Sequence, residues 1–303
     1  MLSQATAPGK VNLLLETQAP RPDGYHELTT IFQATGLRET VTVAAATEMS
    51  ITVDGLDAEH VPTDRSNLVW KVAERVLPGQ PVHLRITKAI PTAGGMAGGS
   101  ADAAAALVAC NALREEPLEI DELDAIAADL GSDINFVLHG GTMLGSGRGE
   151  ILTPVPFSGT LWWVFATQQQ GLSTPAVFRE HDRAGAWGDT RSVQPLVEAL
   201  QAGAPAAEIA PLLFNRLEQS ALVLRPELAR TLAVGEAAGA LRGIVSGSGP
   251  TCAFLCADDA HAHAVARVLE ESGTCHHTVT TTTTGRGAVD KQEKGQQWLT
   301  SST

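Results

Sequence analysis

The sequence predicts a globular α+β protein built in two parts, and three observations support this. Segments with the alternating or apolar pattern of strands gather in the first third of the chain, and helical patterns follow in blocks instead of alternating with strands. A strand pattern restarts at residues 160–167, after a Pro- and Gly-containing stretch at 154–159. Of the 303 residues, 44% are hydrophobic and 18% charged, which is enough for one large core or two ordinary ones.

The first part is expected to hold short strands, then helices, then a hairpin. The strands are expected at residues 10–16, 40–44, 50–53 and 82–87. Proline beside Asp-Gly predicts a reversal of the chain at 21–26. Helices are expected at 67–77, from Ala101 onward, and at 120–131, the last with Asp121 as N-cap and Gly131 as its end. The hairpin is expected at 140–155, with a glycine-rich tip at 145–149.

The second part begins with the strand at 160–167 and continues mainly as helix. The helices are expected at 196–201, 205–224 and 226–240. A strand, a glycine-rich turn and a second strand follow at 243–257, then a further helix and a threonine-rich strand at 277–284. We therefore divide the chain into domains at 1–156 and 157–285. Residues 286–303 are polar and unpatterned, and we expect this tail to be disordered.

Charge and cysteine usage exclude several classes of protein. A formal net charge of −13 argues against a nucleic-acid surface. No apolar run is long enough to span a bilayer, and the first ten residues lack the pattern of a secretory signal, so we expect no membrane partner and a cytoplasmic protein. The four cysteines form no CxxC pair, which favours buried thiols over metal or disulfide frameworks. The sequence leaves the oligomeric state open.

A glycine-rich segment at 94–99 runs directly into an alanine-rich one at 101–107, and this junction predicts an anion site. Glycine lets the backbone approach a ligand, whereas alanine is the best helix former. With Ser100 as N-cap, the free amides and the positive dipole end of the helix would face the loop and favour phosphate. The alternative is a tight strand-to-helix turn packed in a core. A Walker A loop is excluded because Ser100 stands where lysine is required, and no GxGxxG spacing occurs here.

Lys10 and Asp133 are the candidate reactive residues. Lys10 follows Pro8-Gly9 at the start of a strand, where a lysine is most often solvated; an acidic chain that binds phosphate nevertheless needs a fixed cation. Asp133 follows Gly131-Ser132 and could simply cap a short helix. The apolar residues after it instead indicate a partly buried carboxylate that needs a partner, for which we favour Lys10.

Three segments in order resemble the motifs of the GHMP kinase superfamily: "APGKVNLLL" at 7–15, the loop at 91–101 and "VSGSGPTCAF" at 245–254. The resemblance covers residues 7 to about 285. Five motifs narrow it to the branch that phosphorylates 4-diphosphocytidyl-2-C-methyl-D-erythritol: "APGKVNL", "RPDGYHEL", "GGMAGGSADAA", "LGSDINFVLHGGTMLGSGRGE" and "FNRLE". Each motif alone is only moderately specific, but five in the right order make chance improbable.

The resemblance implies a two-domain fold, with a ribosomal-S5-like N-terminal lobe, a ferredoxin-like α/β-sandwich C-terminal lobe, and ATP and substrate between them. It implies ATP-dependent phosphorylation of the substrate's 2-hydroxyl, in the non-mevalonate pathway to isoprenoid precursors. Magnesium should accompany ATP, with Ser100 a weak candidate ligand and the metal ligands otherwise unknown. Asp102 could instead serve the helix dipole.

The resemblance also implies roles for individual residues. Lys10 and Asp133 are the catalytic pair. Asn12, Tyr25, His26 and Phe178 bind the cytidine-bearing substrate, where an aromatic face and hydrogen-bonding groups suit a pyrimidine. The residues expected to bind ATP are Pro91, Thr92, Ala93, Gly94, Gly95, Met96, Ala97, Gly98, Gly99, Ser100 and Ala101.

Two other functions stay open at this point. One is another GHMP kinase, acting on mevalonate derivatives, homoserine or a sugar; "PDGYH" argues against it because those substrates carry no cytosine. The other is a catalytically silent relative that binds nucleotide, and the presence of both Lys10 and Asp133 argues against that. The chain departs from the common pattern at Asn135, where many members have proline, and in "GGMAGG" in place of "GAGLGG". Neither departure removes a reacting group.

Overall fold

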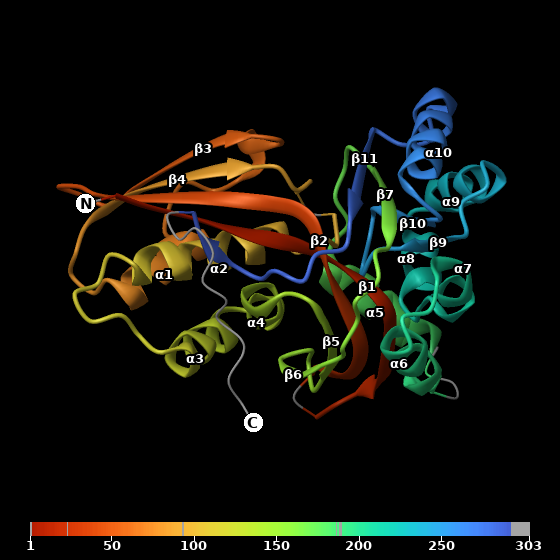
Figure 1. Cartoon of the computed structure of the whole chain (residues 1–303), viewed down its shortest axis with the longest axis horizontal. Coiled ribbons are helices and arrows are strands. Elements are labelled where there is room, and N and C mark those ends of the chain that lie inside the picture. The colour runs from red at the N-terminus through yellow and green to blue at the C-terminus, as the bar shows by residue number, and fades with distance from the viewer. Residues whose placement is uncertain (1, 23, 93, 186, 188–189, 292–303) are drawn as a thin grey trace.

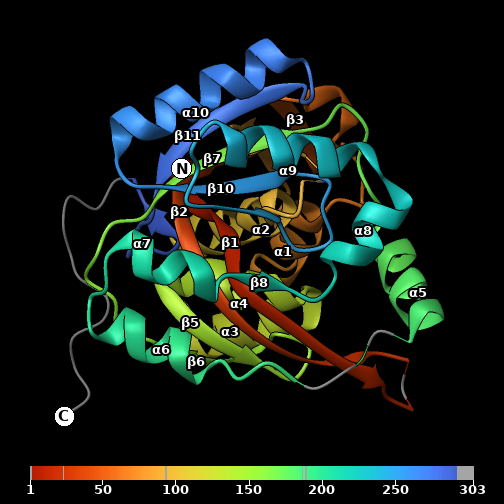
Figure 2. The same ribbon diagram turned by 90° about the vertical axis from the view of Figure 1, so that its right-hand side faces the viewer.

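The computed structural model describes residues 2–22, 24–92, 94–185, 187 and 190–291, which form two lobes (Figures 1 and 2). The lobe on the left of Figure 1 holds a sheet with helices α1 to α4 on one face, and the lobe on the right holds a smaller sheet covered by α9 and α10. The predicted α+β class is confirmed, since strands and helices are segregated within each lobe. Among the described residues, no helix is long and apolar enough to cross a bilayer.

The larger sheet is organised around two very long strands, β1 (Leu2–Pro20) and β2 (His26–Ala45), which pair antiparallel along most of their length. Their register shifts between Pro8 and Lys10 and again between Asn12 and Leu14, so Lys10 lies between two irregularities. The central order is β12-β1-β2-β4-β3. The remaining strands are β3 (Ser50–Gly55), β4 (Val82–Lys88), β5 (Thr142–Ser146), β6 (Ile151–Pro154), β8 (Phe214–Asn215) and β12 (Val289–Asp290).

Helix α2 (Gly98–Asn111) is the central helix of the first lobe. Its alanines 101 and 103–106 are fully buried, which lets the helix pack closely against β1 and β2. Helices α1 (Leu68–Val76), α3 (Ile120–Leu130) and α4 (Ser132–His139) pack beside it, and η1 (Ala58–His60) is a short 3-10 turn after β3. The alanine run therefore brings the N-terminus of α2 close to the sheet.

The smaller sheet has the antiparallel order β11-β7-β10-β9, and its two central strands, β7 and β10, are buried on both faces. In β7 (Trp162–Thr167), Trp163 and Phe165 join the core of the first lobe, while Val164 packs with Phe254 of β10 (Cys252–Cys256) under α9 and α10. Successive side chains of β7 and β10 point to opposite faces of the sheet, and both faces are covered in these two strands. Their sequences are therefore continuous apolar runs. The other elements are α5 (Thr174–Ala184), α6 (Gln194–Gln201), α7 (Ala206–Ile209), η2 (Ala210–Leu212), α8 (Glu218–Leu224), α9 (Glu227–Ala237), β9 (Arg242–Val245), α10 (Asp259–Ser272) and β11 (His277–Thr282).

Several predicted elements are wrong in detail. The single helix expected at 205–224 is three short helices around strand β8, because Asn215 directs its side-chain amide to the carbonyls of Val245 and Gly247 and the chain pairs with β1 there. Helix α2 begins at Gly98 with Ala97 as N-cap, so Ser100 is not the cap. Helix α3 is capped by Glu119 through a capping box with Glu122, not by Asp121.

The start of the predicted tail also differs. Residues 289–290, expected to be disordered, pair with β1 as β12, and Arg38 donates hydrogen bonds to the carbonyls of Arg286 and Gly287. The disorder prediction is therefore wrong for residues 286–291, and residues 292–303 lie outside the described part of the chain. The two sheets divide between Pro154 and Trp162, close to the domain boundary placed at 156/157, although β8 and β12 return to the first sheet. That boundary stays a prediction.

Candidate active site

The three sequence segments singled out above meet around Lys10. The backbone N–H of Lys10 donates to the carbonyl of Met96 in the glycine loop at 3.1 Å. The hydroxyl of Ser246 donates to the carbonyl of Gly95 at 3.1 Å, and a Cβ on Gly95 would overlap the backbone of Ser246. A Cβ on Gly247 would lie 3.4 Å from Lys10 Nζ. Segments more than two hundred residues apart thus form one site, and Gly95 is required there by close approach as well as by its positive φ of 72°.

Lys10 and Asp133 form the predicted pair across this site. Lys10 Nζ lies 3.8 Å from Asp133 Oδ2, and its side chain is 7% exposed against 33% for Asp133. Asp133 belongs to the first turn of α4, where the helix dipole favours its negative charge. Lys10 also donates to Asn12 Oδ1 at 2.6 Å. The Asn12 amide in turn donates to Thr30 Oγ1, whose hydroxyl donates to the carbonyl of Leu14, so the side chain of Asn12 is oriented toward the lysine.

The glycine loop lies between β4 and α2, and its residues differ in what they offer a ligand. Gly99 is exposed and has open space where a Cβ would be. The side chains of Met96 and Ala101 are buried in the core, so these residues can meet a ligand only through their backbone. Asp57 holds the entry of the loop by accepting from the backbone N–H and hydroxyl of Thr92 at 3.1 and 3.0 Å. Ala93, also expected here, lies outside the described residues.

A cavity of about 640 Å³ opens beside the glycine loop. Pro91, Thr92 and Gly94 line it from the first lobe, together with the segment at 56–60. The second lobe contributes polar side chains, among them Gln168, Thr251 and His277. The cavity is large enough for a nucleotide, and the glycine loop that lines it leads into α2.

The residues expected to bind cytidine divide into two neighbourhoods. His26, at the start of β2, is buried and stacks on Phe178 of α5 with ring centroids 4.8 Å apart and an interplanar angle of 32°. Its Nε2 lies 2.7 Å from Asp182 Oδ1. Tyr25 is 55% exposed and its ring contacts the guanidinium of Arg148 in the β5–β6 hairpin at 5.1 Å. Asn12 lies apart from both, beside Lys10.

Three residues of the neighbourhood of His26 were not predicted from the sequence. They are His181, Asp182 and Trp187, which surround His26. His181 is fully buried, its Nε2 lies 2.8 Å from Thr17 Oγ1, and burial together with the charge of His26 lowers its pKa. Their positions at 181, 182 and 187 fall on one amphipathic helix and the loop after it, which carries no sequence pattern specific to a binding site.

A buried charge cluster beneath the glycine loop was also not predicted. Lys88 Nζ lies 2.6 Å from Glu39 Oε1 and 2.7 Å from Asp102 Oδ2, and all three side chains are at most 5% exposed. Asp102 was expected only to complement the helix dipole, and its direct bond to Lys88 corrects that expectation. Val82, Leu84 and Ile86 alternate inward along β4, so the same period places Lys88 inward. This alternation in the sequence could have predicted that Lys88 is buried.

No group of three or more His, Cys, Asp or Glu side chains suited to hold a metal occurs among the described residues. Cys110, Cys252 and Cys256 are buried free thiols and Cys275 is half-buried; burial raises the pKa of Cys110 to about 12. The thiols are thus neutral near pH 7 and have no part in the site.

Comparison with known proteins matches both halves of the chain. The GHMP kinases N terminal domain matches residues 67–141 and the GHMP kinases C terminal domain matches residues 196–275. A protein of Nocardia farcinica named 4-diphosphocytidyl-2-C-methyl-D-erythritol kinase is 54% identical over 274 residues, covering 88% of this chain and 89% of that protein. A protein of the same name from Mycolicibacterium smegmatis is 51% identical over 278 residues, covering 88% and 86%.

Solved structures give the same grouping. A crystal structure of 4-(cytidine 5'-diphospho)-2C-methyl-D-erythritol kinase superposes with a TM-score of 0.77 at 30% identity, covering 92% of this chain and 98% of the other. Homoserine kinase from Cytophaga hutchinsonii superposes with a TM-score of 0.74 at 19% identity, covering 95% and 97%, and shares the fold. The fold expected from the sequence motifs is therefore confirmed.

Proposed function

This chain belongs to the GHMP kinase family, within the branch of the 4-diphosphocytidyl-2-C-methyl-D-erythritol kinases, and on that premise we propose how its site performs the reaction. The reaction is transfer of the γ-phosphoryl group of ATP to the 2-hydroxyl of 4-diphosphocytidyl-2-C-methyl-D-erythritol. The observation that carries the assignment of roles is the convergence of Lys10, the glycine loop and the 246–250 turn on one point, with Asp133 3.8 Å from the lysine.

In the proposed step, the substrate oxygen attacks the γ-phosphorus of ATP. A new P–O bond forms to that oxygen, the bond from the γ-phosphorus to the β–γ bridging oxygen breaks, and the hydroxyl proton passes to Asp133 Oδ2. The products are ADP and the phosphomonoester. Asp133 suits this role because a third of its side chain is exposed while its partner Lys10 is buried. Phosphoryl transfer depends mainly on positioning and charge stabilisation, so a strong base is not required.

The phosphates of ATP meet local positive charge despite the net charge of −13. The N-terminus of α2 directs free backbone amides at the loop, and the helix dipole adds to their effect. Lys10 supplies a full charge, and its bond to Asn12 fixes where that charge lies. We assign the nucleoside to the adjoining cavity of about 640 Å³.

The cytidine of the second substrate is assigned to the pocket around His26. Its ring and that of Phe178 supply aromatic surface, and Tyr25 stands at the exposed side of the same segment. The bond between His26 Nε2 and Asp182 orients the imidazole, so one polar edge of the pocket is fixed before substrate arrives. A pyrimidine needs both an aromatic face and directed polar groups, and both are present here.

Mg²⁺ is proposed as the companion of ATP. The described residues lack a three-ligand protein cluster, which fits a metal carried mainly by the phosphates, the usual mode for Mg²⁺. The hydroxyl of Ser100, in the first turn of α2, is the side chain we assign to it. When bound, the ion would neutralise part of the charge of the phosphates.

Phosphorus NMR of the purified protein with MgATP and 4-diphosphocytidyl-2-C-methyl-D-erythritol tests the proposal. We expect ADP and a new phosphomonoester signal to appear together, and both to be lost in Asp133→Asn. ATP left intact by a folded wild-type protein would overturn the substrate assignment. Homoserine and mevalonate in the same assay would then test another GHMP kinase, and binding of ATP without turnover of any alcohol would indicate a silent relative.

A further inference from the structure

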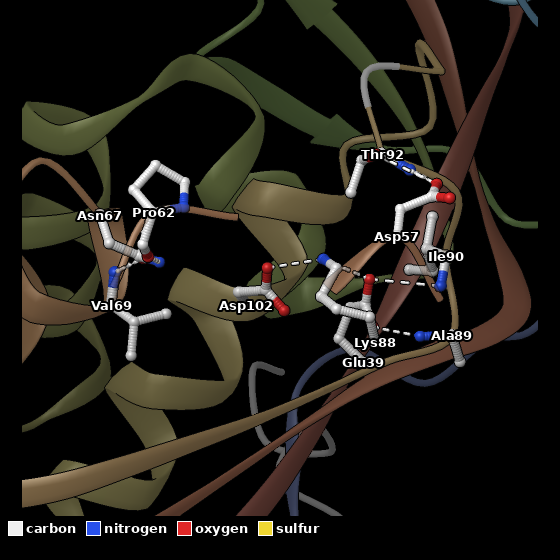
Figure 3. A network of polar contacts seen from close by, with 10 residues as sticks. All are labelled: Glu39, Asp57, Pro62, Asn67, Val69, Lys88, Ala89, Ile90, Thr92 and Asp102. Carbon is white, nitrogen blue, oxygen red and sulfur yellow. Dashed lines mark hydrogen bonds and ion pairs between the residues drawn. The ribbon is translucent and has the colours of Figure 1, made fainter. Parts of the chain in front are cut away.

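The buried cluster of Glu39, Lys88 and Asp102 lies directly beneath the phosphate loop (Figure 3). Each comes from a different element: Glu39 from β2, Lys88 from the end of β4 and Asp102 from α2. The side chain of Glu39 is 0% exposed and that of Lys88 1%. None of the three has the access to solvent that contact with a substrate requires, so the cluster acts through other groups.

Glu39 holds the entry of the loop. Its Oε2 accepts the backbone N–H of Ala89 at 2.7 Å, and its Oε1 accepts that of Ile90 at 3.2 Å, as the dashed lines in Figure 3 show. Ile90 immediately precedes Pro91, the first residue of the glycine loop. Charge-assisted bonds to two successive amides fix the direction in which the chain enters the loop.

The same cluster reaches the exit of the loop. Asp102 accepts from Lys88 one turn after Gly98, the first residue of α2. A Cβ on Gly98 would lie 3.4 Å from both Glu39 Oε1 and Lys88 Nζ, so the helix start packs against the cluster. Lys88 therefore links the carboxylate at the loop's entry to the carboxylate in the helix at its exit.

The charges in the cluster are unequal, with two carboxyl groups around one ammonium. Burial and the charge of Asp102 raise the pKa of Glu39 to about 7, against the opposing effect of Lys88. Asp102 Oδ1 is buried and has no hydrogen-bond partner among the described residues. A buried ion pair often adds no more stability than apolar residues of similar volume, so the geometry that the cluster imposes on the loop is its more specific contribution.

We propose that Glu39 is a positioning residue for nucleotide binding: with Lys88 and Asp102 it forms a brace that fixes both ends of the phosphate loop. The proposal rests on the proposed function only in taking ATP as the ligand of this loop. The amides of the loop and of the first turn of α2 are then aligned before ATP arrives, so the effect of the brace appears in ATP affinity and not in the affinity for the second substrate.

Glu39→Gln and Asp102→Asn form a matched pair that tests the brace. Each removes one negative charge beside Lys88. In Asp102→Asn the side-chain amide oxygen can still accept from Lys88, so the link to the exit of the loop is kept. Only Glu39 accepts the backbone N–H groups of Ala89 and Ile90, which lead into the loop. In Glu39→Gln one amide loses its acceptor. We expect the KM for ATP and the calorimetric Kd for MgATP to rise roughly tenfold in that variant, and by less than about twofold in Asp102→Asn. The KM for the cytidine substrate stays unchanged in both.

Equal weakening of ATP binding in the two variants would overturn the positioning role and leave only an effect of charge. Unchanged ATP binding in a folded Glu39→Gln would overturn it as well. Calorimetry needs no second substrate, so it tests the brace separately from the proposed function. If Glu39→Gln binds MgATP more weakly than wild type, and wild type does not phosphorylate the cytidine substrate, the proposed function is refuted and the brace is supported.

Hydrogen exchange of the backbone amides in the wild-type protein tests the brace even if Glu39→Gln does not fold. The amides of Ala89 and Ile90 should be protected without nucleotide, because the brace aligns the loop in advance. Rapid exchange of both amides that slows only when MgATP binds would overturn the inference.

Discussion

The molecule holds two lysine–carboxylate groupings within one lobe, and they differ in closeness and in access to solvent. In the brace, Lys88 lies 2.6 and 2.7 Å from two carboxylates, and none of the three side chains is more than 5% exposed. In the proposed catalytic pair, Lys10 lies 3.8 Å from the carboxylate of Asp133, whose side chain is 33% exposed. The first grouping is closed on all sides, and the second is open on the side of the aspartate.

The difference shows how the same chemical pair serves two purposes. In a buried ion pair, water cannot replace a partner that moves away, so separating the charges costs much free energy. The atoms are therefore held in one arrangement. A pair with an exposed carboxylate can exchange its partner, and a substrate hydroxyl can take the place of water next to Asp133. In the proposed roles, Lys88 therefore fixes the geometry of the loop, whereas Lys10 supplies charge at the proposed point of phosphoryl transfer.

Asp133→Asn should have the largest effect on turnover. The amide cannot accept the substrate proton, so we expect kcat to fall roughly 10³-fold while calorimetric binding of MgATP is retained. Asp124→Asn is the matched control, since Asp124 has a similar exposure of 30% and pairs with His139 at the other end of α4. Turnover of Asp133→Asn close to wild type would remove this residue from the mechanism.

Lys88→Met and Lys10→Met should separate stability from turnover. Removing Lys88 strands two buried carboxyl groups, so we expect the free energy of unfolding to fall by about 3–5 kcal/mol. Lys10 faces a carboxylate that water reaches, so its loss should reduce turnover with little change in stability. Urea unfolding and steady-state kinetics on both variants test this. Equal destabilisation would show that the two groupings do not differ as described.

The free energy of unfolding should depend on pH because Glu39, in the buried cluster with Lys88 and Asp102, has a raised pKa. The pKa of Glu39 is raised from 4.5 to about 7 in the folded protein, so its contribution is complete below pH 4.5 and is lost as the pH rises through about 7. The free energy of unfolding of wild type, measured relative to Glu39→Gln, should fall by roughly 3 kcal/mol between pH 4.5 and pH 8. A difference that does not vary with pH would contradict the raised pKa.

Tyr25→Ala should have the smallest effect and touches neither lysine grouping. We expect the KM for the cytidine substrate to rise roughly tenfold, which is the loss of one stacking contact, and the KM for ATP to stay within about twofold. Because Tyr25 is exposed, we expect its replacement to leave the unfolding temperature unchanged, and thermal unfolding checks this. Equal changes in both KM values would refute the cytidine assignment.

Local patterns were sufficient for much of the fold. The strand pattern of β4 and the helical pattern of α1 predicted these elements to within a residue or two of their observed bounds. The helix expected at 205–224 failed because strand β8 depends on Asn215 meeting the backbone of residues 245 and 247, which no local window contains. β12 was missed for the same reason, since a two-residue strand is defined by its partner β1.

The sequence by itself determined the α+β class, the glycine-to-alanine junction, and Lys10 and Asp133 as candidates, because motifs and periodicity are properties of neighbouring residues. Only the tertiary structure decided which inward-facing charges meet. Glu39 and Lys88 each lie on the inward-facing side of a strand. Lys88 pairs with both Glu39 and Asp102 because the sheet and α2 pack against each other around these side chains. The stacking of His26 on Phe178 is decided the same way, by chain segments that pack together across a long sequence separation.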